Sequence, residues 1–184
     1  AKYCNFLDQF LPQLVRYLKK RGIDKRCYFH VSDEPHIDHL EAFGQAAAMV
    51  HGHLEGFPFI DALSNLEYYE HGLVRCPIPA SNHLEPFVAK GIKNLWTYYC
   101  VSQWDQVANR FFCMPSTRNR ILGAQLYKYD LAGFLHWAFN FYFTQYSTRP
   151  LDPFIETDAG RAFPAGDAFL VYPGKEGPID SIRG

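Results

Sequence analysis

Two adjacent carboxylates, Asp33 and Glu34, lie where a predicted strand over residues 26–31 ends. The strand segment is rich in aromatic and β-branched residues, and Pro35 cannot continue a ladder in mid-sheet. A helical pattern follows at once. We therefore expect the pair at the C-terminal end of a strand, the edge at which α/β folds usually assemble their chemistry.

Two interpretations of Asp33 and Glu34 are open from the residues alone. In the first, Asp33 caps the following helix and Glu34 lies in its first turn, where the helix dipole favours both. In the second, one carboxyl stays protonated and delivers a proton, while the other stays ionised and orients or stabilises a developing positive charge.

A third carboxylate, Asp61, follows a second short predicted strand at residues 57–60. Together with Glu34 it could form a conventional two-carboxylate glycosidase pair. The simpler interpretation, in which Asp61 is the N-cap of a helix after Ser64, is favoured.

Aromatic and amide side chains gather near the ends of two further predicted strands, at residues 94–101 and 133–140. Tyrosine hydroxyls and an asparagine amide can hydrogen-bond a sugar, and a tryptophan face can stack on it. A sheet or barrel core would explain the tryptophans equally well. The candidates for sugar binding are Trp96, Tyr98, Tyr99, Trp137 and Asn140.

Other kinds of chemistry have little support. The net charge of −1 gives no electrostatic footprint for nucleic acid or an anionic membrane, and no apolar run approaches the ~20 residues that span a bilayer. The five cysteines form no Cys-x-x-Cys pair, and His36-x-x-His39 lacks converging ligands. We expect no metal, no thiol nucleophile, no phosphate-binding loop and no cofactor.

The candidate residues have to be positioned by alternating helices and strands. Helices are expected at residues 4–21, 35–53, 65–69, 85–90 and 117–129, and strands at 26–31, 57–60, 94–101, 133–140 and 167–174, with 76–79 at most an edge or irregular strand and 143–166 rich in loops. This alternation favours a parallel α/β sheet or barrel in a single domain over residues 1–184. About five clear strands are fewer than a complete eight-stranded barrel needs, so a small open sheet or the later portion of a barrel is expected.

Four motifs, in this order, resemble the catalytic domain of glycoside hydrolase family 123. They are YFHVSDEP at 28–35, LWTYY at 95–99, GFLHWAFN at 133–140 and GDAFLVYPG at 166–174, and residues 178–183 also fit. The resemblance covers nearly the whole chain. It implies the C-terminal portion of a (β/α)8 TIM barrel, without the first strands and the final helix.

The resemblance also implies a carbohydrate substrate and the removal of β-linked N-acetylgalactosamine with retention. In such substrate-assisted catalysis the 2-acetamido oxygen of the sugar attacks its own anomeric carbon and forms an oxazolinium ion. Carried over, Asp33 would orient the acetamido N–H and stabilise the cation, and Glu34 would protonate the leaving oxygen and later activate water. Tyr98 or Tyr99 would hydrogen-bond the acetamido carbonyl, and Trp137 and Asn140 would line the sugar pocket.

Two alternatives stay open. One is a glycosidase that uses Glu34 with Asp61 on sugars without a 2-acetamido group. The other is a non-catalytic carbohydrate-binding or structural half-barrel in which the acidic pair is only a cap. A partial barrel would also have two open sheet edges, so we expect self-association.

Overall fold

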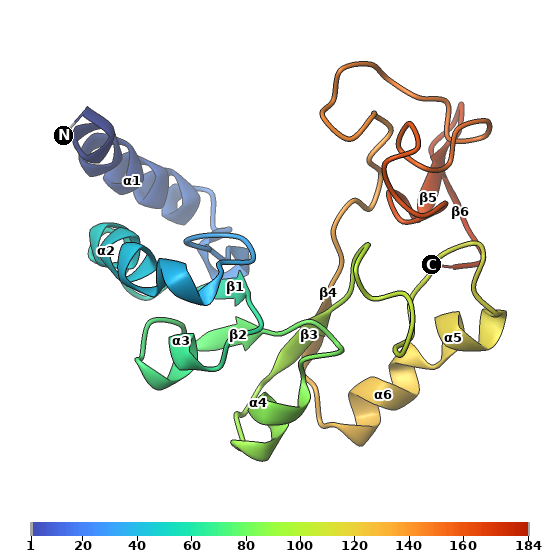
Figure 1. Ribbon diagram of the computed structural model, residues 1–184. Coiled ribbons are helices and arrows are strands. Elements are labelled where there is room, and N and C mark those ends of the chain that lie inside the picture. Colours follow the sequence, from blue (N-terminus) through green and yellow to red (C-terminus); the bar gives the residue numbers. More distant parts are fainter. Residues whose placement is uncertain (1, 184) are drawn as a thin grey trace. The chain divides into compact units, whose positions relative to one another are not determined.

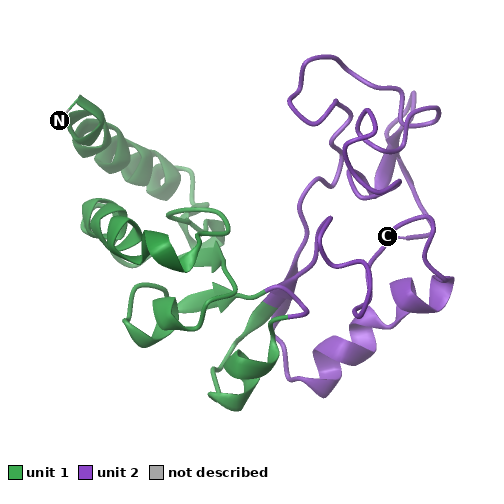
Figure 2. Ribbon diagram, in the orientation of Figure 1, with its two compact units in different colours: residues 1–79, 83–96 green, residues 80–82, 97–184 purple. Residues whose placement is uncertain are grey.

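The computed structural model describes residues 2–183 and divides into two compact units (Figure 2). The first unit holds the described residues up to 79 together with 83–96, and the second holds 80–82 and the described residues from 97 onward. Both units combine helices with short strands, which agrees with the predicted α/β class (Figure 1). The expectation of a single domain stays a prediction.

The first unit opens with the long helix α1 (Lys2–Lys20), which agrees with the helix predicted at residues 4–21. Leu7, Leu11 and Leu18 are buried along one face, and basic residues fill the last turn, where they suit the helix dipole. The chain then leaves the helix at Gly22, whose φ of +65° is the left-handed conformation that glycine adopts at little cost.

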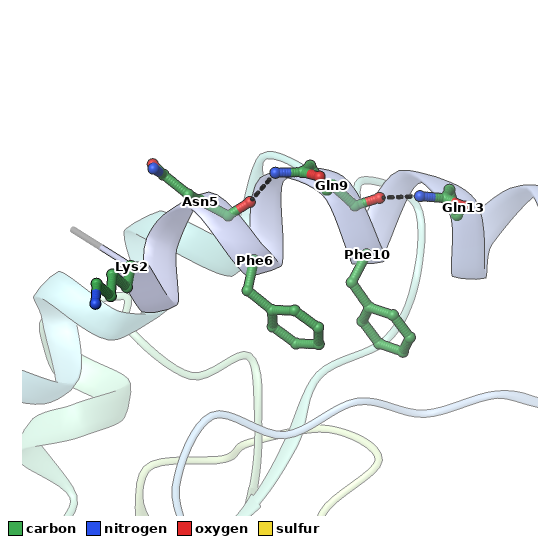
Figure 3. A pocket seen from close by; sticks show the side chains of 6 residues that line it. All are labelled: Lys2, Asn5, Phe6, Gln9, Phe10 and Gln13. Carbon is green, nitrogen blue, oxygen red and sulfur yellow. Dashed lines mark hydrogen bonds between the residues drawn. The ribbon is translucent and has the colours of Figure 1, made fainter.

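A second face of α1 carries exposed aromatic side chains. Phe6 and Phe10 are 54% and 43% exposed, and their stacked ring centroids are 5.3 Å apart. Figure 3 shows both rings on the same side of the helix, with the side chain of Gln9 donating to the Asn5 carbonyl at 3.1 Å. The packing of α1 therefore depends on its leucines.

The strand predicted at residues 26–31 is reduced to one pairing. A 3₁₀ turn, η1 (Asp24–Arg26), precedes it, and only Phe29 forms a parallel bridge, with Phe59. A second 3₁₀ turn, η2 (Ile37–His39), then leads into α2 (Leu40–His51), which agrees with the helix predicted there. The acidic turn thus lies between a single strand-like pairing and a helix.

The next strands pair in parallel. β1 (Ile60–Ala62) starts later than predicted and pairs with β2 (Cys76–Ile78). The prolines had predicted at most an edge or irregular strand at residues 76–79, and β2 agrees with this, because both strands of a two-stranded sheet are edges. Pro77 removes one N–H group only, and the Ile78 carbonyl still accepts a hydrogen bond from Leu63 at 3.1 Å. The short helices α3 (Glu67–Glu70) and α4 (Glu85–Ala89) complete the first unit.

The second unit contains the remaining elements. β3 begins at the end of the first unit and forms a two-stranded sheet with β4, and the hairpin of β5 and β6 is antiparallel. The helix predicted at 117–129 is divided at Ile121, while residues 143–166 hold no helix or strand, as predicted. The bounds are β3 (Trp96–Tyr98), α5 (Ser116–Arg120), α6 (Leu122–Lys128), β4 (Gly133–Leu135), β5 (Val171–Pro173) and β6 (Pro178–Asp180). Over residues 2–183, no helix has the length and apolar character needed to cross a membrane.

A buried arginine holds the loops of the second unit together. Arg183 is 6% exposed and donates to the backbone carbonyls of Arg110, Gly166 and Phe169. Gly166 has a φ of +85°, and a Cβ there would lie 2.8 Å from the Phe112 ring and 2.9 Å from the Arg183 guanidinium. Only glycine fits between these groups.

We expect the two faces of α1 to respond differently to truncation. Leu11 is 6% exposed and belongs to a core cluster, so Leu11→Ala should lower the free energy of unfolding by about 2–4 kcal/mol. The matched change Phe10→Ala removes a side chain that is 43% exposed and should cost about 1 kcal/mol or less. Urea unfolding followed by circular dichroism measures both, and equal losses would contradict this description of the core.

Candidate active site

The acidic turn is exposed and tied to β1. Asp33 and Glu34 both lie at the surface, and the Glu34 N–H donates to the Ala62 carbonyl at 2.8 Å. Glu34 has a φ of 43°, a left-handed conformation that residues other than glycine seldom adopt. The backbone from which the Glu34 side chain extends is therefore held by the neighbouring strand.

Asp33 is not the cap of the following helix. The N-cap of η2 is His36, whose Nδ1 accepts from the Asp38 N–H at 3.4 Å. Of the two interpretations of the acidic pair, the capping one therefore loses its geometric basis.

Asp61 lies in the middle of β1 and is only 1% exposed. Its Oδ1 accepts from the backbone N–H groups of Val31 (2.8 Å) and Ser32 (3.1 Å), directly before the acidic turn. Burial raises its pKa to about 6, although these two hydrogen bonds act in the opposite direction. The interpretation of Asp61 as the N-cap after Ser64 is wrong, because the N-cap of α3 is Leu66, without a side-chain hydrogen bond.

Trp96 is the aromatic candidate in the first unit. It is partly buried, and its ring centroid lies 6.1 Å from that of Tyr28 at an interplanar angle of 50°. Tyr28 itself is 52% exposed, so the predicted strand presents this side chain to the surface.

The tyrosine candidates belong to the second unit and are buried there. Tyr98 is 9% exposed and Tyr99 is 2% exposed. Tyr99 packs against Phe134 at 4.6 Å between centroids and against the His136 ring at 6.0 Å. Burial raises the pKa of Tyr99 to about 12 and lowers that of His136 to about 4. At neutral pH, Tyr99 is thus a neutral phenol beside a neutral imidazole.

Trp137 is oriented by a residue that the sequence interpretation did not single out. Its indole Nε1–H donates to Oδ2 of Asp167 at 3.0 Å, and Asp167 is 2% exposed. Burial raises the pKa of Asp167 to about 6, opposed by the indole hydrogen bond and by Arg183. The sequence does contain a signal for the role of Asp167, because this acidic residue stands directly before an apolar run. A carboxylate buried in such a segment needs a polar partner.

The last candidate, Asn140, has an exposed side chain, and its backbone forms an antiparallel bridge with Phe169. The structure thus divides the predicted residues between the two units. The first unit holds Asp33, Glu34, Asp61 and Trp96, and the second holds Tyr98, Tyr99, Trp137 and Asn140. Among residues 2–183, no three His, Cys, Asp or Glu side chains cluster in a way that could hold a metal ion.

Comparison with known families identifies the chain. The family model described as glycoside hydrolase 123, catalytic domain, matches residues 1–184, so the chain belongs to this family. This confirms the resemblance inferred from the four motifs. A search of curated proteins found no match.

The chain also resembles a solved structure. It aligns with a family 123 glycoside hydrolase from Clostridium perfringens, studied for the details of glycolipid glycan hydrolysis, with a TM-score of 0.63 and 17% identity. The alignment covers 96% of this chain and 30% of that one, so the chain spans about 30% of the length of this enzyme. At this identity the likeness shows a shared fold.

The buried carboxyl of Asp167 should make stability depend on pH. Its pKa is about 6 in the folded chain against an ordinary value of 3.8, so the folded state binds the proton more tightly. Its contribution is most favourable below pH 3.8 and declines as the pH rises through 6, by up to about 3 kcal/mol. Urea unfolding at pH 4 to 7 should show wild type losing stability relative to Asp167→Asn. A pH-independent difference between the two would contradict the raised pKa.

Proposed function

We propose that this chain is the part of a retaining exo-β-N-acetylgalactosaminidase-like glycosidase that carries its acid/base pair. The observation that supports this most is the exposed acidic turn Asp33-Glu34, held at the end of a parallel pairing, in a chain that belongs to a glycoside hydrolase family. The substrate would be a glycan that ends in a β-linked N-acetylhexosamine.

The fold proposed for it is the C-terminal portion of a (β/α)8 barrel. Segments that are consecutive along the chain pair in parallel at Phe29 with Phe59, β1 with β2, and Ala80 with Tyr98. Helices lie between these segments, as the βαβ units of a barrel require. The acidic turn follows the first of these pairings at its C-terminal end, where barrel enzymes assemble their active sites.

The two carboxylates would divide the work. Asp33 accepts the acetamido N–H of the substrate and keeps the negative charge that stabilises the oxazolinium ion. Glu34 donates its proton to the leaving glycosidic oxygen while the acetamido oxygen forms its bond to the anomeric carbon. The resulting Glu34 carboxylate then takes a proton from water, which opens the oxazolinium and restores the acid.

Within the second unit, Trp137 and Asn140 are the proposed sugar-binding residues. The Trp137 indole is fixed by Asp167 and is half-buried against Phe141 and Phe163, so the exposed part of its ring would stack on a sugar face, and the exposed amide of Asn140 would hydrogen-bond a hydroxyl. Trp96 would be a further stacking surface. The tyrosine that hydrogen-bonds the acetamido carbonyl would be Tyr98 or Tyr99, although both are buried in this chain.

The two-carboxylate alternative has less support. Asp61 is 1% exposed and already accepts two backbone hydrogen bonds, so its carboxylate is poorly placed to reach an anomeric carbon. A non-catalytic half-barrel remains the competing hypothesis from another class, and the loss of the capping role for Asp33 argues against it.

We expect Glu34→Gln to lower kcat by about 10²–10⁴-fold on an aryl β-N-acetylgalactosaminide, because the general acid/base is lost. Asp33→Asn should also lower kcat strongly, since the neutral amide cannot stabilise the cation. The assay measures aryl release by this chain and by the chain extended upstream to a complete domain. The plain β-galactoside, which lacks the acetamido group, should not be hydrolysed.

The matched controls are Asp38→Asn and Glu41→Gln, which change nearby acidic residues outside the proposed pair. Both should keep wild-type turnover. Full activity of Glu34→Gln would move the assignment to the non-catalytic hypothesis, and equal turnover of both substrates would favour a mechanism without the acetamido group.

We also propose that the isolated chain self-associates through open sheet edges. Over residues 2–183 each sheet has two strands, so strand edges are available to a second copy. Light scattering should show a mass above that of the 21.2 kDa monomer that rises with concentration. Phe10→Glu should leave this behaviour unchanged if edges carry it, and a clean monomer at all concentrations would contradict it.

A further inference from the structure

We propose that Asp61 is the positioning residue of the acidic pair: its buried carboxylate holds the backbone of Val31 and Ser32 so that Asp33 and Glu34 keep fixed directions. This inference rests on the proposed function of that pair. In it Asp61 does not touch the substrate and acts through the turn.

Convergence on one atom is the first argument. Two successive N–H groups, of Val31 and Ser32, donate to Oδ1 of Asp61 at 2.8 and 3.1 Å, across 30 and 29 residues of sequence. Successive N–H groups of an extended strand point to opposite sides, so this shared acceptor fixes a bend at which the strand-like pairing at Phe29 ends. The hydrogen bonds become stronger when the carboxyl is ionised.

Backbone strain at Glu34 is the second argument. Its φ of 43° places a non-glycine residue in the left-handed region, which is unfavourable for a residue with a Cβ. Such a conformation persists only where its surroundings fix it. The turn is fixed on both sides, by Asp61 before it and by the hydrogen bond from the Glu34 N–H to the Ala62 carbonyl after it. Both anchors come from β1.

The third argument is that Asp61 is more than a space-filling core residue. Its Oδ2 is buried and has no hydrogen-bond partner among residues 2–183, an arrangement that is costly for a carboxyl. A neutral side chain such as asparagine would avoid burying a charge, but its hydrogen bonds to the two N–H groups would be weaker than those of a carboxylate. Keeping an ionisable acceptor here is explained by the two N–H groups that it orients.

Charged groups around Asp61 set when it is ionised. Burial raises its pKa to about 6, the two N–H donors and the His30 ring lower it, and the negative charge of Asp33 raises it. The titration of this carboxyl should therefore change the chemical shifts of the two backbone amides that donate to it.

The first experiment follows the backbone amide resonances of Val31 and Ser32 by ¹⁵N NMR in the intact chain from pH 4.5 to 8. Both should shift together with one midpoint near 6, because each donates to the same titrating oxygen. His30→Gln should preserve this titration, which separates Asp61 from the neighbouring imidazole. Asp167→Asn, which changes the other buried carboxyl, should also preserve it, whereas Asp61→Asn should abolish it.

The second experiment is kinetic and uses the extended domain. Asp61→Asn should lower kcat about 10–100-fold with KM changed less than about threefold, because a displaced acid/base pair impairs the chemical step. Its log kcat against pH should also lose an inflection near 6 that wild type and Asp38→Asn keep. If Asp61 were merely structural, Asp61→Asn would reduce the amount of folded enzyme, and the enzyme that still folds would keep the wild-type dependence of kcat on pH.

The outcomes separate this inference from the proposed function. Loss of turnover in Glu34→Gln with unchanged kcat in Asp61→Asn would overturn the positioning role alone. Amides that do not titrate in wild type would overturn it without any variant, even if Asp61→Asn fails to fold. Titrating amides in a domain that hydrolyses nothing would support the hold of Asp61 on the turn and reject the glycosidase assignment.

Discussion

The hydrogen bonds between β1 and the segment that ends in Asp33 and Glu34 are the interaction on which the candidate site depends. The Ile60 N–H donates to the Phe29 carbonyl beside the parallel bridge, Asp61 accepts from two amides, and the Ala62 carbonyl accepts from Glu34. Three consecutive residues of one short strand therefore fix the path of the acidic turn. Without them, two neighbouring carboxylates on an exposed loop would point in many directions and would share no defined environment.

The second unit also uses a buried aspartate to orient another residue. Asp167 is buried, keeps one oxygen on the Trp137 indole, and lies near the Arg183 side chain that gathers three backbone carbonyls. In both units a buried aspartate accepts hydrogen bonds from the groups that it orients. The cost of burying each carboxyl is visible in its raised pKa. Polar residues inside these units are thus used to orient other residues, while the leucines and aromatic rings supply the packing.

Much of the fold could be predicted from the sequence, because helix periodicity and capping are local. The extent of α1 and the left-handed Gly22 that follows its end depend on residues within one or two turns. The strand lengths could not be predicted, since pairing depends on a partner elsewhere in the chain. The same reason hid the role of Asp61, whose amide donors lie about 30 residues away. Local sequence rules predicted for Asp61 only the role of N-cap for a helix after Ser64. The two prolines, Pro77 and Pro79, did predict that β2 would be at most an edge strand.

The order of the parallel pairings has a consequence for how the chain is made. Each of them joins a segment to the next one along the sequence, from Phe29 through β1 and β2 and again from Ala80 to Tyr98. Contacts of short sequence separation form early and quickly. The later segment of each pairing can therefore find its partner already synthesised, and these pairings can form one after another as the polypeptide leaves the ribosome. The acidic turn, held by the first of them in chain order, can then take its shape before the later pairings have formed.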